Sequence, residues 1–112
     1  MQEDDRVYLG HMFDTARKAV EKTRGATRSS YDADENLRLA LAHLIQIIGE
    51  AARRVSAEFR RSHTDVPWAE IIGMRHKVVH DYLNVDEDIV WEVATGDLPR
   101  LVAALEKIVP PD

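Results

Sequence analysis

The sequence has no cysteine among its 112 residues. This absence excludes a disulfide scaffold, a thiol nucleophile, an iron–sulfur cluster and the cysteine-rich zinc sites. It also fits a reducing compartment, so a cytoplasmic location is expected. Glycine and proline are scarce as well, with five and four copies, while 45% of the residues are apolar and 31% are charged. Such a composition is typical of a soluble globular protein rather than a disordered or collagen-like chain.

Long apolar runs are also missing, and residues 1–5 are acidic. A membrane-spanning helix needs about 20 apolar residues, and a signal peptide needs a basic start before its apolar stretch. Because neither pattern is present, no membrane role is expected. The chain is too short to divide its interior between two cores, so residues 1–112 are predicted to form a single domain.

The net charge is -5. This balance argues against a protein that coats nucleic acid by bulk electrostatics, which requires clustered cations, but it does not exclude a local basic cleft. Arginine supplies 11 of the 15 basic residues, and its side chain suits bidentate binding of phosphate or carboxylate.

Apolar residues recur at helical spacing along the chain. The first predicted helix starts near Asp4 and Asp5 and ends in the segment 23–30, and the second starts at Asp32 or Asp34 and runs to Phe59. The two apolar stripes consist of Leu9, Met12, Phe13, Ala16 and Val20, and of Leu37, Leu41, Leu44, Ile48, Ala51, Val55 and Phe59.

A third helix is predicted to start with Pro67 in its first turn and to run to Leu83. The segment 84–86 is expected to end it and to cap a short helical stretch over 89–93, and a last helix follows Asp97 and stops at 110–111. No strand pattern is evident. We predict an all-α fold, an antiparallel bundle of four to five helices.

Arg75 interrupts the expected core stripe of the third helix, which falls at positions 68, 71, 72, 75, 78, 79 and 82. An unpaired buried charge is costly, so Arg75 should meet a carboxylate, lie at a crevice, or contact a partner subunit or a ligand. Glu50 is one candidate partner, and for Arg75 taken alone a buried or interfacial ion pair is favoured, because structural arginine pairs far outnumber catalytic ones.

Two histidines follow Arg75 at informative spacings. On an ideal helix His80 lies about 140° around and about 7.5 Å along the axis from Arg75, so the two converge only if Arg75 reaches around or if two copies of the helix meet across a dimer. His76 and His80 have the i, i+4 spacing of helical zinc sites, but Lys77 replaces the glutamate of that motif and no third ligand is evident. We therefore expect neither a metal nor a cofactor.

Other polar residues have simpler interpretations. Tyr82 lies nearly on the face of Arg75 in the predicted last turn, as an accessible hydroxyl or as an edge-of-core tyrosine. His11, His43 and His63 share no spacing and are interpreted as solvated or helix-end residues. The sequence also lacks a phosphate-binding glycine loop and a serine-hydrolase motif, which argues against nucleotide hydrolysis and against serine esterase activity.

Gly49 and Gly73 lie inside predicted helices, where each costs about 1 kcal/mol relative to alanine. Close approach of the second and third helices would explain both glycines. It would bring Glu50 near Arg75, together with a polar row of His43, Gln46 and Arg53 or Arg54. A carboxylate, an arginine and a histidine in one crevice would be a candidate functional site.

The segment from Pro67 to Tyr82, with Gly49-Glu50-Ala51 upstream and Asp97-Leu98-Pro99 downstream, resembles the HepT-like branch of the HEPN superfamily. The resemblance covers nearly the whole chain, and its most specific part is Arg75, His80 and Tyr82 at their spacing. It implies an all-helical homodimeric toxin of a toxin–antitoxin module that cleaves RNA without a metal ion.

By this resemblance, Arg75 would hold the scissile phosphate and His80 would act as general acid or base on the ribose 2′-hydroxyl. The partner would be a minimal nucleotidyltransferase antitoxin that transfers AMP to Tyr82. Family members commonly have asparagine where this chain has His76, which is a supporting polar group, a specificity determinant or a sign of lost activity. Glu50 is a possible supporting residue. The alternative function is a noncatalytic helical dimer that binds a protein or a nucleotide.

Overall fold

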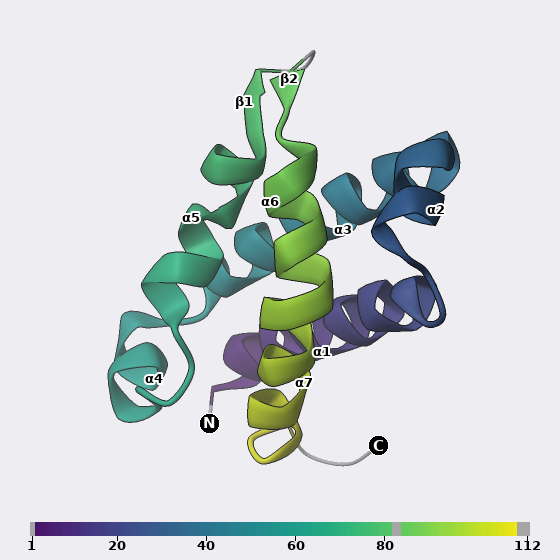
Figure 1. The fold of residues 1–112 in the computed structure, drawn as a ribbon. Coiled ribbons are helices and arrows are strands. Elements are labelled where there is room, and N and C mark those ends of the chain that lie inside the picture. Colours follow the sequence, from purple (N-terminus) through teal and green to yellow (C-terminus); the bar gives the residue numbers. More distant parts are fainter. Residues whose placement is uncertain (1, 82–83, 110–112) are drawn as a thin grey trace.

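The computed structural model describes residues 2–81 and 84–109, which fold mainly into helices around one hydrophobic cluster (Figure 1). In chain order the elements are α1 Glu3–Thr23, α2 Arg28–Ala33, α3 Glu35–Arg54, α4 Ala57–Ser62, α5 Trp68–Val78, β1 Val79–Asp81, β2 Asn84–Val85, α6 Glu87–Glu92, the π-helical η1 Val93–Asp97, and α7 Leu98–Glu106. The predicted all-α class is confirmed.

The core lies where the long helices meet. α1 packs along α3, α3 packs on α5, and α7 crosses α1 (Figure 1). The predicted stripe of α1 is buried at Leu9, Met12 and Ala16, and its Phe13 and Val20 are partly buried at the margin of the core. Within the described ranges, none of the helices has the length and apolar character needed to cross a membrane.

The predicted second helix is wrong at its end, because it stops at Arg54 and a separate helix, α4, starts at Ala57. The buried carboxylate of Asp5 causes this break. It is 3% exposed and accepts hydrogen bonds from the backbone N–H and the hydroxyl of Ser56, both at 2.7 Å. The Ser56 hydroxyl also accepts from the Phe59 N–H and caps α4. Asp5, predicted only as a helix-start acid, therefore ties α1 to the junction of α3 and α4.

The predicted break over 23–30 is also shorter than expected, because α2 starts at Arg28. Thr27 and Ser30 form a reciprocal capping box that starts this helix. Tyr31 of α2 is fully buried, and its hydroxyl donates to Glu87 of α6 at 2.6 Å. This contact fixes α2 on the C-terminal half of the chain.

The third helix ends at Val78, five residues earlier than predicted, and the absence of strands is a wrong prediction. β1 and β2 pair antiparallel with Val79 opposite Val85, and the Asp86 N–H donates to the Val78 carbonyl at 2.8 Å. β-Branched valines at 79 and 85 favour extended backbone over helix. His80 therefore lies on a strand, and the ideal-helix geometry between Arg75 and His80 does not apply.

The C-terminal part forms one continuous helical column rather than two separated helices (Figure 1). Asp86 caps it as predicted, by accepting from the Ile89 N–H. The expected interruption at Gly96 and Asp97 is instead a π-helical turn, in which the Leu98 N–H bonds to the Val93 carbonyl. The wider turn gives room to Pro99, whose ring would clash with a regular α-helical turn.

Gly49 allows the close approach of α3 and α5 that the sequence predicts. A Cβ atom added at Gly49 would lie 3.1 Å from the backbone carbonyl oxygen of Ile71 and 3.6 Å from that of Ile72. The same explanation is wrong for Gly73, where an added Cβ would meet nothing within 4 Å. Of these two glycines, Gly49 is therefore the one that packing requires.

Alanine substitutions at the two glycines are expected to change stability in opposite directions. Gly49→Ala should lower the free energy of unfolding, because a backbone carbonyl cannot turn away and overpacking typically costs about 1–3 kcal/mol. Gly73→Ala should raise it by up to about 1 kcal/mol through helix propensity. Urea unfolding followed by circular dichroism measures both, and a Gly49→Ala protein as stable as Gly73→Ala would contradict the close contact.

Candidate functional site

Arg75 lies on α5, but not on its core face. The buried residues of this helix are Trp68, Ile71, Met74 and Val78, whereas the Arg75 side chain is 47% exposed. The predicted stripe is confirmed at positions 68, 71 and 78 and wrong at position 75, because Met74 occupies the core there and Arg75 lies at the edge facing α3. The expectation that Arg75 meets a carboxylate is nevertheless confirmed.

Glu50 of α3 is that carboxylate, and it has three arginine partners. Its oxygens lie 3.1 Å from Nη1 of Arg75, 2.5 Å from Nη2 of Arg53 and 3.3 Å from Nε of Arg54. Arg53 and Arg54 come from the last turn of α3, where basic side chains favour the helix dipole. One negative charge thus faces three positive charges, and the cluster is a local cationic site on a chain of net charge -5.

The cluster changes the ionisation of its members. Hydrogen bonding from Arg53, with further contributions from Arg54, lowers the pKa of Glu50 from 4.5 to about 2 despite the opposing effect of desolvation. The pKa of Arg54 is raised by the Tyr8 hydroxyl and by Glu50. Glu50 therefore stays ionised at any pH at which the protein would act.

A pH-dependent contribution to stability follows from the lowered pKa of Glu50. Its folded pKa lies below its ordinary value, so the wild type should be more stable than Glu50→Gln above about pH 4.5, with the difference lost as the pH falls toward 2. The effect should be small because the pairs are open to solvent. Thermal unfolding of both proteins across this pH range measures it, and a pH-independent difference would contradict the assignment.

Glu50, Arg54 and Arg75 of the cluster belong to the lining of an open hollow of about 430 Å³ between α1, α3 and α5. Its lining residues are Tyr8, His11, His43, Gln46, Ile47, Glu50, Ala51, Arg54 and Arg75. The predicted polar row is thus confirmed for His43, Gln46 and Arg54, while Arg53 pairs with Glu50 from outside the lining.

Sequence reasoning missed the contribution of α1 to this hollow. Tyr8 and His11 were not linked to the motif residues, although their i, i+3 spacing places them on one face of a helix. Their rings meet edge to face, with centroids 6.2 Å apart. Their proximity to Arg75 arises from the packing of α1 on α3, which no local pattern reveals.

The remaining predicted site residues are not brought together on one helical face. His76 is exposed on α5, and His80 belongs to β1, so the two histidines do not have the i, i+4 relation of a continuous helix. Tyr82 lies outside the described residues. His63 ends α4 and stacks on Phe59 with ring centroids 3.9 Å apart, as expected of a helix-end histidine. Among the side chains that the structure describes, which do not include those of residues 79–83, no three acidic or histidine groups are placed so that they could hold a metal ion.

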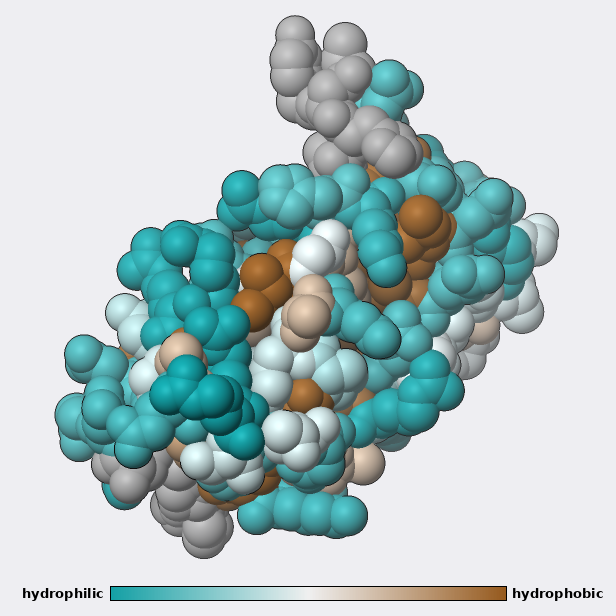
Figure 2. All heavy atoms as spheres, turned by 90° about the vertical axis from the view of Figure 1, so that its left-hand side faces the viewer, coloured by the Kyte–Doolittle hydropathy of each residue, from teal (hydrophilic) through white to brown (hydrophobic). Residues whose placement is uncertain are grey.

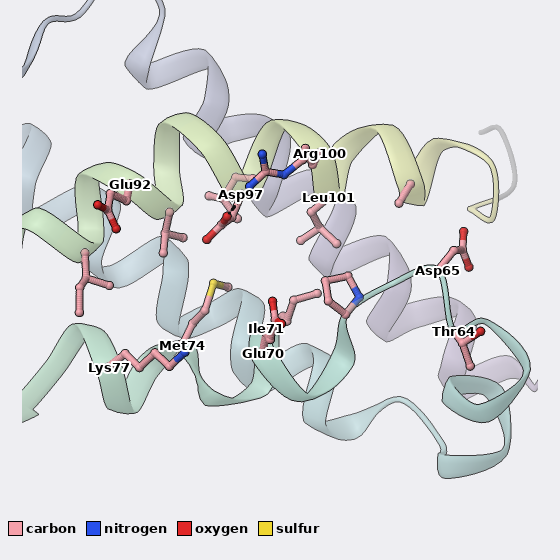
Figure 3. Close-up of a pocket in the computed structure, with 15 residues that line it drawn as sticks. Thr64, Asp65, Glu70, Ile71, Met74, Lys77, Glu92, Asp97, Arg100 and Leu101 are labelled. Carbon is pink, nitrogen blue, oxygen red and sulfur yellow. Dashed lines mark hydrogen bonds and ion pairs between the residues drawn. The ribbon is translucent and has the colours of Figure 1, made fainter.

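A second hollow, of about 550 Å³, lies between α5 and the α6–α7 column (Figure 3). Ile71, Met74 and Leu101 line its interior, and its charged lining residues are the acids Asp65, Glu70, Glu92 and Asp97 and the bases Lys77 and Arg100. Asp97 is paired with Arg100 at 2.7 Å. On the side of the molecule that carries α4 and α5, apolar side chains surface only in small areas among hydrophilic residues (Figure 2). Four carboxylates against two basic side chains leave the lining net negative, which makes this groove unfavourable for a polyanion.

Comparison with known proteins gives one consistent result. Residues 12–108 match a family described as ribonuclease HepT-like. The chain is 35% identical over 104 residues to "Putative RNase TTE0752" of Caldanaerobacter subterraneus subsp. tengcongensis, covering 93% of each protein. It is 30% identical over 108 residues to "Probable ribonuclease HepT" of Thermococcus cleftensis, covering 96% of this chain and 98% of the relative. No solved structure is significantly similar to it.

Proposed function

Because this chain belongs to the ribonuclease HepT-like family and is by that membership a ribonuclease, we propose that it is the toxin of a toxin–antitoxin module and cleaves RNA without a metal ion. The observation that carries the proposal is the position of Arg75. This motif arginine lies at the edge of a cationic hollow and remains 47% exposed, with access to a phosphate.

The reaction uses the RNA's own 2′-hydroxyl as nucleophile. His80 removes the proton from this hydroxyl, the 2′-oxygen attacks the adjacent phosphorus, and the bond to the 5′-oxygen of the next nucleotide breaks. A proton from a general acid neutralises the leaving oxygen. The products are a 2′,3′-cyclic phosphate and a 5′-hydroxyl end, so DNA is not a substrate.

Arg75 binds the scissile phosphate and stabilises the charge that develops on its oxygens. To bind the phosphate, Arg75 exchanges its contact with Glu50 for a contact with a phosphate oxygen, and the other members of the cluster keep the free-energy cost of this exchange low. When Arg75 turns toward a phosphate, Glu50 keeps its contacts to Arg53 and Arg54 at 2.5 and 3.3 Å. Glu50 is therefore a positioning residue, and it is not left as an unpaired charge during turnover.

The complete site is a composite of two chains. In the proposed homodimer the Arg75 and His80 residues of both copies line one cleft, so that a histidine of one copy serves a phosphate held by the other. His76, next to Arg75 on α5 and exposed, supplies a further polar group where the family commonly has asparagine.

Control of the toxin is proposed to act through Tyr82. A minimal nucleotidyltransferase antitoxin transfers AMP from ATP to the Tyr82 hydroxyl and releases pyrophosphate. The added phosphodiester carries a negative charge close in sequence to Arg75 and His80, and both its charge and its bulk oppose RNA entry. Incubation with the antitoxin and ATP should add the mass of one AMP to the wild type and none to Tyr82→Phe.

The decisive experiment is cleavage of a mixed RNA by the protein expressed without a partner, in the presence of EDTA. Intact mass must first confirm that Tyr82 is unmodified. Cleavage that leaves cyclic phosphate ends supports the proposed function. No cleavage by the folded, unmodified protein would overturn it and would favour a noncatalytic helical dimer, a reading consistent with the net charge of -5.

A further inference from the structure

We propose that the hollow between α1, α3 and α5 is a subsite for one nucleotide of the RNA next to the scissile phosphate. The base lies against the rings of Tyr8 and His11, and the phosphate lies on Arg54 and Arg75. The inference rests on the proposed function, because Arg75 is shared by the two sites.

The size and position of the hollow suit a single nucleotide. Its volume of about 430 Å³ falls within the range of about 300–1,000 Å³ that is typical of small-molecule sites. It is open on one side, as a site on a polymer must be. Arg75 belongs to its lining, so a nucleotide bound here is continuous with a phosphate held by the motif arginine.

The charge of the hollow favours a phosphodiester. Glu50 is bound through Nε of Arg54 and through Nη1 of Arg75. Each guanidinium has five N–H donors, so both keep further donors for phosphate oxygens. Two arginines against one carboxylate leave a net positive lining, in contrast to the acidic groove on another side of α5 (Figure 3).

The aromatic pair supplies a surface for a base. The ring planes of Tyr8 and His11 are inclined at 77°, so one ring presents its edge to the other and the two are not stacked face to face. His11 is exposed and Tyr8 is half-buried. Stacking of bases on such rings tolerates any sequence, because every base has an aromatic face.

The wall that carries these rings is held in place. Asp5 lies one turn before Tyr8 on α1, and its two hydrogen bonds to Ser56 anchor that end of the helix. The guanidinium carbon of Arg54 lies over the Tyr8 ring, 5.9 Å from its centroid, in a cation–π contact. The phosphate-binding and base-binding groups are therefore preorganised next to each other.

Binding of an RNA oligonucleotide with 2′-O-methyl groups tests the subsite without cleavage. His11→Ala and Tyr8→Ala should each weaken binding about 5- to 150-fold, which corresponds to the loss of one base–aromatic stack. His11→Phe and Tyr8→Phe keep a ring and should bind nearly as the wild type. Arg100→Ala, which removes an exposed, carboxylate-paired arginine from the acidic groove, is the matched control and should not change the affinity.

The outcomes separate the subsite from the proposed function. If the wild type cleaves RNA but His11→Ala and Tyr8→Ala, shown to be folded by circular dichroism, bind the oligonucleotide as tightly as the wild type, the subsite is overturned and the function stands. If binding falls in both alanine variants and is kept in both phenylalanine variants, the subsite is supported. If His11→Phe and Tyr8→Phe lose as much affinity as the alanine variants, stacking is overturned.

Discussion

Replacement of His80 by alanine is expected to lower the rate of RNA cleavage by about 10²–10⁴-fold, the usual contribution of a positioned general acid or base. The substitution removes the group that takes the proton from the 2′-hydroxyl and leaves Arg75 and its phosphate contacts in place. The rate constant under saturating RNA should therefore fall, while the affinity for a 2′-O-methylated oligonucleotide should change little. Single-turnover cleavage and equilibrium binding measure the two quantities separately.

The neighbouring histidine provides the control for this experiment. His76→Ala removes an exposed imidazole from α5, four residues from His80, and should reduce cleavage far less. Sedimentation should show the same oligomeric state for the wild type, His80→Ala and His76→Ala. If His80→Ala cleaves RNA at the wild-type rate, or only dissociates the dimer, the role of His80 is organisational and the proposed mechanism is wrong.

Replacement of Arg75 by alanine is expected to reduce the rate constant of cleavage by about 10²–10³-fold, as the loss of a transition-state donor typically does. Arg75→Lys should recover only part of this loss, because an ammonium group cannot bind two phosphate oxygens in the planar geometry of a guanidinium. Stability should change little, since Glu50 retains Arg53 and Arg54.

Arg53→Ala is the matched control for Arg75→Ala. Arg53 contacts the same carboxylate at 2.5 Å but does not line the hollow. It should leave the cleavage rate constant within a few-fold of the wild type. Equal losses of activity in Arg53→Ala and Arg75→Ala would mean that Arg75 acts only as one member of the ion-pair cluster, and it would not be a catalytic residue.

Local sequence patterns predicted the parts of the molecule that depend on local interactions. The stripe of α1, the cap at Asp86 and the helical class follow from spacing and capping. Gly49 correctly indicated where two helices approach, because a glycine inside a helix needs a reason outside the helix. The pairing of Arg75 with Glu50 followed from the cost of leaving a charge unpaired.

Several of the errors concern contacts between residues far apart in the chain. The end of α3 depends on Asp5, 51 positions before Ser56, and the end of α5 depends on pairing with β2. The sequence analysis assigned the core position to Arg75, whereas the neighbouring Met74 is buried. On a helix as short as α5, the packing against other helices decides which of two neighbouring residues faces the core. Tyr8 and His11 joined the hollow because α1 packs on α3, a tertiary effect without a local signal.

The linings of the two hollows beside α5 carry net charges of opposite sign, and this difference affects the orientation in which RNA associates with the protein. Carboxylates around the groove repel a polyanion, while the arginines beside Glu50 attract it. A molecule of net charge -5 thus presents a favourable approach from one direction, so that RNA is steered in an orientation that leads to Arg75. The association rate should accordingly fall as ionic strength rises and the field is screened over shorter distances.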